Sequence, residues 1–93
     1  MMGGSPERAR EHYRRAVELS QGGKASPHVA LAETVAVREQ NLEEFRGLLE
    51  KALAVDVNEV LKWRLSNVVA QERAQWLLDR IPDLFVDFEE ESP

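Results

Sequence analysis

Four helix-start signals are spaced along this chain, and they constrain its fold more than any other feature. Ser5–Pro6 and Ser26–Pro27 each place a capping side chain before a proline, which suits the first turn of a helix because that turn leaves its N–H groups unpaired. Asn41–Glu44 and Asp56–Glu59 have the spacing of a capping box, in which the last side chain reaches back to the first residue's N–H. These signals predict an all-α fold of about four helices.

Apolar residues at helical spacing follow each signal and set the expected helix lengths. Gly22–Gly23 ends the first helix, and Pro82 ends or kinks the fourth. No strand is predicted, because the one extended-looking stretch, Leu84–Val86, is too short to pair by itself. The expected helices are Pro6–Ser20, Ser26 to about Val37, Asn41 to about Val55, and Asp56 to Pro82.

The fourth expected helix carries two apolar rows on different sides. A helix with two apolar faces packs against two neighbours, or against one neighbour while the other face forms a groove for something apolar. The second expected helix has one charged residue between Val29 and Val37, which is typical of a helix packed between neighbours. The two rows are Leu61, Leu65, Val69 and Trp76 on one side, and Trp63, Ala70, Ala74, Leu77 and Ile81 on the other.

Charge divides the 93 residues into a balanced body and an acidic end. Of the 17 acidic residues, five lie after Pro82 with no basic residue among them, and the remainder equal the 12 basic residues in number. A nucleic-acid-binding protein normally gathers a basic excess on one face, so this balance argues against that function. We expect a linker at residues 1–5, one TPR-like helical domain at 6–82 and an acidic, solvated tail at 83–93.

Two further functional classes are disfavoured by what the sequence lacks. No stretch approaches the roughly 18 consecutive apolar residues that a membrane span needs. Met1–Pro6 has no basic region followed by an apolar stretch, so we expect no secretory signal within this sequence. We leave open whether Met1 is the natural start or whether the chain is a fragment.

Catalytic and ligand-binding motifs are few. His12 and His28 lie on different expected helices, without the i, i+4 spacing of a helical metal site, so each is expected at the surface. Zero cysteines exclude thiolate ligands and a cysteine nucleophile. Ser20 and Ser66 lack the flanking glycines of a nucleophile elbow. We therefore expect no enzyme, no metal and no cofactor.

A binding groove is one interpretation of two large side chains on the fourth helix. Trp63 and Asn67 lie one turn apart and would face the alanines of the second helix, whose small side chains leave space for an apolar ligand or a partner helix. Core filling, with Asn67 satisfied by a loop backbone, is the plainer interpretation. The residues assigned to this groove are Ala32, Ala36, Trp63, Asn67 and Ala70.

Residues 7–17 are similar to residues 43–53, and this spacing is near the period of tetratricopeptide (TPR) repeats. In that repeat the second helix carries a small-aromatic-small pattern, here Ala9, Tyr13 and Ala16, because small residues let helices approach while the ring fills the gap. Chance similarity between two amphipathic helices is the alternative. If the repeat is real, the first helix lacks its partner. The face with these three residues would then bind missing upstream sequence or a second copy of the chain.

Three segments in a fixed order carry a family resemblance: a Ser-Pro helix with small residues at 25–33, a Leu-Leu-Glu-Lys-Ala helix at 45–53 and an Asn-containing Trp-Leu-Leu helix at 64–78. With the flanking stretches 6–10 and 83–85, they resemble the C-terminal part of the T-component proteins of tripartite ATP-independent periplasmic (TRAP) transporters. The resemblance implies an all-helical, TPR-type periplasmic lipoprotein that assists a solute-binding subunit and carries an apolar channel. We expect this sequence to lack the family's N-terminal segment, with its export signal, lipid-bearing cysteine and earlier helices.

The resulting hypothesis is a non-catalytic, TPR-like array of antiparallel helical hairpins. It would present an apolar groove to a periplasmic solute-binding protein or to a small organic ligand. The alternative is a free-standing cytoplasmic TPR-like adaptor that binds a protein segment, and a weaker one is an accessory subunit of an enzyme. A homodimer through Ala9, Tyr13 and Ala16 is expected if the first helix is half of a broken repeat.

Overall fold

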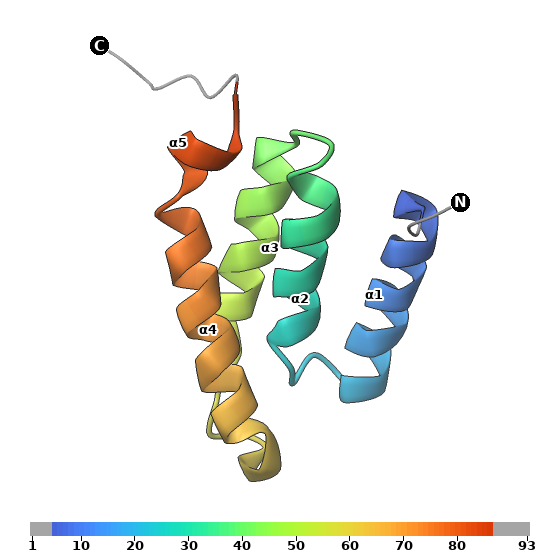
Figure 1. Cartoon of the computed structure of the whole chain (residues 1–93). Helices are drawn as coiled ribbons and strands as arrows, with labels where there is room; N and C mark the ends of the chain where they lie inside the picture. The colour runs from blue at the N-terminus through green and yellow to red at the C-terminus, as the bar shows by residue number, and fades with distance from the viewer. Residues whose placement is uncertain (1–4, 87–93) are drawn as a thin grey trace.

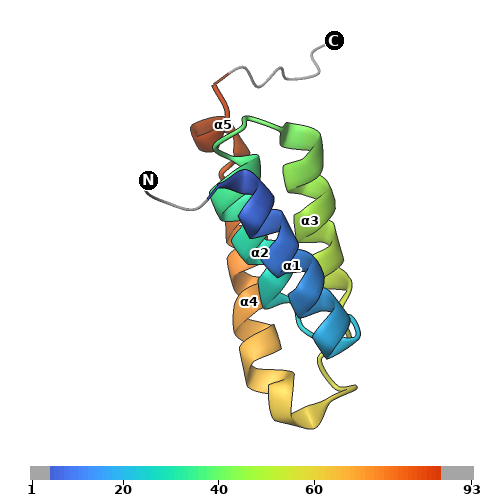
Figure 2. The same cartoon turned by 90° about the vertical axis from the view of Figure 1, so that its right-hand side faces the viewer.

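Four helices lie side by side, each antiparallel to the one before it (Figure 1): α1 (Pro6–Ser20), α2 (Ser26–Leu31), α3 (Leu42–Ala54) and α4 (Arg64–Leu78). The computed structural model describes residues 5–86, and within these residues it is all-helical with no strand, as predicted. α2, α3 and α4 pack against one another, whereas α1 lies at the edge and packs chiefly against α2 (Figure 2). The other elements are the π-helical turn η1 (Ala32–Ala36), the 3-10 turn η2 (Leu61–Trp63) and α5 (Ile81–Leu84).

α1 begins and ends where its sequence signals predict. The Ser5 hydroxyl accepts a hydrogen bond from the Arg8 N–H at 3.1 Å, which satisfies one of the N–H groups that the first turn leaves free. At the other end, Gln21 and Gly22 adopt positive φ angles of 54° and 77°. Gly22 takes this left-handed conformation without the Cβ clash that other residues meet, so the chain can turn towards α2.

The second helix differs from its prediction in two respects. Ala25, not Ser26, occupies the N-cap position, and no side chain caps this end, so the expected capping role of Ser26 is wrong. After Leu31 the helix widens into η1, where the Val37 N–H bonds the carbonyl of Ala32 five residues back at 3.2 Å. Such π-helical turns are rare and often lie at functional sites.

α3 starts as predicted, with the Asn41 Oδ1 accepting from the Glu44 N–H at 3.1 Å. The second half of the expected capping box is not made, because the Glu44 carboxylate instead accepts hydrogen bonds from Arg10 on α1. At the far end, the Gln71 amide on α4 donates to the last carbonyls of α3, including that of Val55 at 2.8 Å. Carbonyls in the last turn of a helix lack the partner four residues on that interior carbonyls have, so Gln71 supplies a donor there and ties α4 to α3.

The predicted start of the fourth helix at Asp56 is wrong. The Asp56 carboxylate accepts from the Asn58 N–H, two residues on, at 2.9 Å and thereby closes a turn instead of capping a helix. The chain then passes through η2, and α4 begins at Arg64. α4 ends at Leu78, so Pro82 does not terminate it but lies in the first turn of α5.

One of the two apolar rows on the fourth helix is buried and the other is exposed. Trp63 is half-buried, and the rest of its row lies in the core between α2, α3 and α4. The opposite row is exposed: Leu65 is 76% exposed and Val69 56%, and the Trp76 ring at its end is covered by the guanidinium groups of Arg73 and Arg80. α2 lies between α1, α3 and α4, as its nearly charge-free sequence predicts. The core residues of this part are Ala70, Ala74, Leu77 and Ile81.

The core extends beyond Pro82 to Phe85. The Phe85 ring is 4% exposed and meets the ring of Phe45 edge to face, with ring centroids 4.9 Å apart. The Gln40 side chain holds this end of the chain, since it donates to the Leu84 carbonyl at 3.0 Å and accepts from the Val86 N–H at 2.9 Å. Asp83 is exposed, and the remaining acidic residues of the expected tail lie outside the described residues.

Candidate functional site

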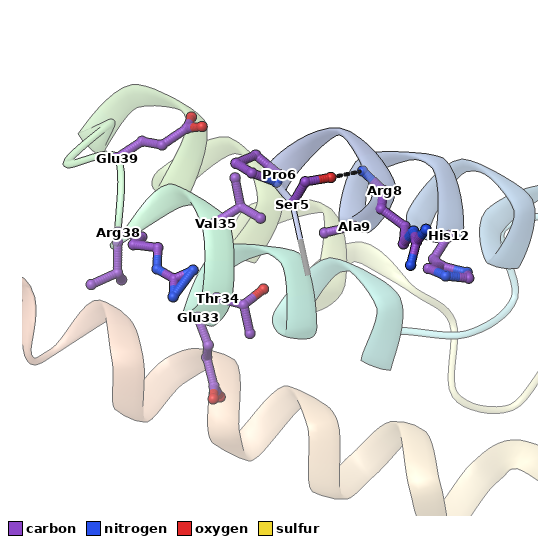
Figure 3. Close-up of a pocket in the computed structure, with 11 residues that line it drawn as sticks. Ser5, Pro6, Arg8, Ala9, His12, Glu33, Thr34, Val35, Arg38 and Glu39 are labelled. Atoms are coloured by element: carbon purple, nitrogen blue, oxygen red, sulfur yellow. Dashed lines mark hydrogen bonds between the residues drawn. The ribbon is translucent and has the colours of Figure 1, made fainter. Parts of the chain in front are cut away.

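A groove of about 690 Å³ lies between α1 and the η1 end of the second helix (Figure 3). Pro6 and Ala9 on α1, with Val35 and Val37 opposite them, give it a largely apolar lining. Polar and charged side chains border it, which is the usual composition of a binding site. These bordering residues are Ser5, Arg8, His12, Glu33, Thr34, Arg38 and Glu39.

The groove continues along the same pair of helices as a second hollow of about 430 Å³. Both hollows are lined by Ala9, His12 and Thr34, so they adjoin, and we call the two together the α1–α2 groove. The sequence-predicted interaction face Ala9, Tyr13 and Ala16 lines this second part. The structure therefore brings these three residues together, and it places α2 of the same chain beside them.

Tyr13 and His28 join the two walls of the groove. The Tyr13 hydroxyl lies 2.9 Å from Nδ1 of His28, and the two rings meet edge to face at a centroid distance of 5.4 Å. Burial lowers the pKa of His28, and the positive charge of Lys51 lowers it further. Burial also raises the pKa of the Tyr13 phenol, and the negative charge of Glu44 raises it further. Both side chains are thus held in their neutral forms at neutral pH.

Arg10 is the second link between α1 and the rest of the molecule. Its guanidinium Nη2 lies 2.8 Å from Oε1 of Glu39, and Nη1 and Nη2 both contact the Glu44 carboxylate. A guanidinium fork suits such contacts because its N–H groups lie in one plane. α1 has no fully buried residue, so these polar contacts and the partly buried Ala9 and Tyr13 position it against α2.

The second residue set that the sequence singled out is divided among η1, η2 and α4. Ala32 and Ala36 are fully buried, and Ala70 is 7% exposed. Asn67 on α4 is 2% exposed, and its side chain holds the loop that precedes α2: it accepts from the Ala25 N–H at 2.9 Å and donates to the Gly23 carbonyl at 2.8 Å. Asn67 is thus buried and satisfied by a loop backbone, as the core-filling interpretation expects. A solute groove at these residues stays a prediction.

Trp63 is half-buried at the same end of the molecule, where its ring covers Gly23. A Cβ atom on Gly23 would lie 3.0 Å from the Trp63 ring, so the absence of a side chain permits this contact. The ammonium groups of Lys24 and Lys62 lie 4.9 and 5.7 Å from the ring centroid. These distances are within the range of cation–π attraction.

The two histidines differ from each other. His12 is exposed as predicted, whereas His28 is 6% exposed, so the expectation that it lies at the surface is wrong. A signal for its burial was present, because His28 lies at helical spacing from Ala32, Val35 and Ala36 on the apolar side of its helix. Over residues 5–86, no three His, Cys, Asp or Glu side chains are gathered as a metal ion would require.

Over residues 5–86 the chain is all-helical, with two adjoining open hollows between α1 and the second helix. No helix in the described part of the chain is long and apolar enough to cross a bilayer. The family model for the TRAP transporter T-component matches residues 1–85, and the chain belongs to this family.

A relative in Treponema pallidum (strain Nichols), which bears the name "Uncharacterized protein", is 27% identical to this chain over 85 residues. The aligned part covers 91% of the chain and 26% of the relative, so the chain spans about a quarter of that protein's length. No solved structure matches the chain.

Proposed function

We propose that this chain is a non-catalytic binding module of a TRAP transporter T-component. The α1–α2 groove would receive part of a periplasmic solute-binding protein or a small organic ligand. The family match carries this proposal, because it covers residues 1–85 and so includes both walls of the groove. The transporter-associated, non-enzymatic character of the family supports a role in binding instead of chemistry.

The antiparallel helices support a TPR-like arrangement. In such an array each helical hairpin contacts its neighbours and offers a concave side to partners. α1 would be the second helix of one repeat, and α2 with α3 the complete hairpin that follows. The exposed outer side of α1 and its lack of fully buried residues fit a helix with one neighbour on the described chain.

The composition of the groove favours binding over catalysis. Its lining is mainly apolar, and His12 is its one histidine among the described residues. The π-helical turn η1 supplies Glu33, Thr34 and Val35 to one wall, so the irregular part of the second helix faces the groove (Figure 3). We place the protein in the periplasm on the basis of its family.

Calorimetric titration of the chain with the solute-binding protein of the same transporter tests this proposal. Thr34 is exposed and lines both parts of the groove, so Thr34→Trp fills it without disturbing the core. Ala54→Trp adds the same ring to an exposed site on α3, away from the groove, and is the matched control.

We expect binding by the unmodified chain, equal binding by Ala54→Trp, and at least about a tenfold loss with Thr34→Trp, as for a side chain that blocks an interface centre. Circular dichroism confirms that both variants are folded. No heat of binding with the unmodified chain, or full binding by Thr34→Trp, contradicts the proposal.

A further inference from the structure

The charges around the α1–α2 groove are unevenly neutralised. Both carboxylates that line it are engaged by arginines of other surfaces: Glu39 by Arg10 at 2.8 Å, and Glu33 by Arg73 on α4 at 2.7 Å. Arg8 and Arg38 also line the groove, and neither has an ion-pair partner among residues 5–86. The groove therefore has two arginines without an ion-pair partner among these residues, one on each wall, whereas both of its carboxylates have one.

The positive charge is confined to one end. Arg8 and Arg38 line the first hollow together with Ser5 and Pro6. The second hollow is lined by no Asp, Glu, Lys or Arg side chain, and its lining is mainly apolar. The residues that line the second hollow alone are Tyr13, Ala16, Ser26, Pro27, Ala30 and Leu31. A complementary occupant is thus acidic at one end and apolar at the other.

The length of the groove indicates the size of that occupant. It follows α1 from Ser5 to Ala16, and a helix rises about 1.5 Å per residue, which gives roughly 17 Å. An extended peptide advances about 3.3 Å per residue, so about five residues match this length. Pockets for small molecules usually bury about 70–90% of the surface of their ligand. A long groove open to solvent suits an extended segment better than a compact molecule.

We infer that the occupant of the α1–α2 groove is an extended segment of the partner protein, about five residues long, with apolar side chains at one end and carboxylates at the other. Arg8 and Arg38 would contact the carboxylates from opposite walls. Ion pairs between guanidinium and carboxylate groups are strong and directional because two parallel N–H donors can meet two oxygens. This inference rests on the proposed function and names the chemistry of the partner's contact.

The probe is a synthetic peptide, Leu-Leu-Phe-Glu-Glu-amide, with a dye on its N-terminal amine; the full chain is titrated into it and the fluorescence anisotropy of the dye is recorded. The control peptide replaces both Glu residues with Lys. The test variants are Arg8→Gln and Arg38→Gln, whose side chains line the groove and lie outside the core. Arg46→Gln on α3 is the matched control, since Arg46 is exposed and lies outside both hollows.

We expect the acidic peptide to bind and the lysine peptide to bind at least about tenfold more weakly. Each groove variant should weaken the acidic peptide about three- to tenfold, and raising the salt concentration should weaken it too, because exposed charges are screened. Arg46→Gln should bind like the unmodified chain. Equal binding of both peptides, or no effect of either groove variant, overturns the inference.

Two results separate this inference from the proposed function. If the solute-binding protein binds and Thr34→Trp blocks it, while the arginine variants have no effect, the proposed function stands and the acidic segment is wrong. If the acidic peptide binds through both arginines but the solute-binding protein does not bind, the groove chemistry stands and the proposed partner is wrong. Binding of dodecanoate through the same arginines, without binding of the peptide, overturns the segment in favour of a small amphipathic anion.

Discussion

The Tyr13 hydroxyl on α1 lies 2.9 Å from the His28 Nδ1 on α2, and this contact joins the two walls of the α1–α2 groove. α1 packs chiefly against α2, so few contacts fix its position. The Tyr13–His28 contact is therefore important for where α1 lies. Its strength depends on the protonation state of the buried imidazole, so the groove wall is expected to respond to acid.

Acidification should destabilise the protein through His28. Burial holds the folded-state pKa of His28 below its ordinary value of 6.5. Above pH 6.5, His28 is neutral in both the folded and the unfolded chain, and the free energy of unfolding has its full value. As the pH falls below this value, the unfolded chain binds the proton more readily, so the free energy of unfolding decreases by at most about 1.4 kcal/mol per pH unit for this group.

Urea denaturation at a series of pH values between about 4 and 8 measures this effect, with the range set by the ordinary titration of histidine. His28→Gln should flatten the part of the profile just below the ordinary histidine pKa. Tyr13→Phe removes the hydroxyl while keeping the ring, so it should lower stability at neutral pH and keep the part of the pH dependence that burial of His28 causes. A profile unchanged by His28→Gln would show that other groups cause the acid response.

Asn67→Ala should be among the most destabilising polar substitutions in this chain. It would leave the Ala25 N–H and the Gly23 carbonyl without partners next to a buried loop, at a cost of about 2–3 kcal/mol. Asn58→Ala is the matched control. Asn58 is exposed, and its backbone N–H bond to Asp56 survives the change, so the effect should stay within about 0.5 kcal/mol. Equal urea midpoints for the two variants would contradict this role.

The helix starts that depend on one local hydrogen bond could be predicted from the sequence. The start of the fourth helix could not, because the Asp56 side chain can bond either of two backbone N–H groups. Ser5 and Asn41 cap their helices through the backbone N–H three residues on. Asp56 has the same kind of side chain, but it bonds the N–H two residues on and makes a turn. The two kinds of bond are chemically equivalent, so local sequence does not decide between them. Contacts between distant residues, such as the packing of Trp63 over Gly23, are not visible in local sequence either.

The position of the groove could be predicted only in part. The small-aromatic-small face of α1 indicated Ala9, Tyr13 and Ala16, which do line the α1–α2 groove. Small residues on the second helix were ambiguous, because they either leave space or let neighbouring helices come close. Ala32 and Ala36 are fully buried against those neighbours. The pairing of Arg10 with Glu39 depends on tertiary contacts that spacing does not reveal.

Phe85→Ala should reveal that the folded unit continues past Pro82. The ring is 4% exposed and packs against Phe45, so its removal leaves a cavity and should cost about 3–5 kcal/mol. Val86→Ala is the neighbouring control, because Val86 is 84% exposed and should change stability by less than about 0.5 kcal/mol. Thermal unfolding of both variants checks this expectation. Equal melting temperatures would place Phe85 outside the core.

Two glycines should respond to alanine in opposite directions. A Cβ on Gly47, within α3, meets nothing within 4 Å, so Gly47→Ala should raise the free energy of unfolding by about 0.5–1 kcal/mol through the loss of glycine's flexibility. A Cβ on Gly23 would lie 3.0 Å from the Trp63 ring and 3.1 Å from the Ser20 carbonyl, so Gly23→Ala should destabilise. Chemical denaturation compares the two, and stabilisation by Gly23→Ala would contradict the observed contact.

The central claim is that the α1–α2 groove is the surface that meets the transporter's solute-binding protein. Amide chemical-shift mapping tests it most directly, with the labelled chain observed while the unlabelled solute-binding protein is added. We predict the largest shifts at Ala9, His12 and Thr34, which line both parts of the groove. Shifts confined to Leu65 and Val69 on the exposed row of α4, or no shifts at all, would contradict the claim.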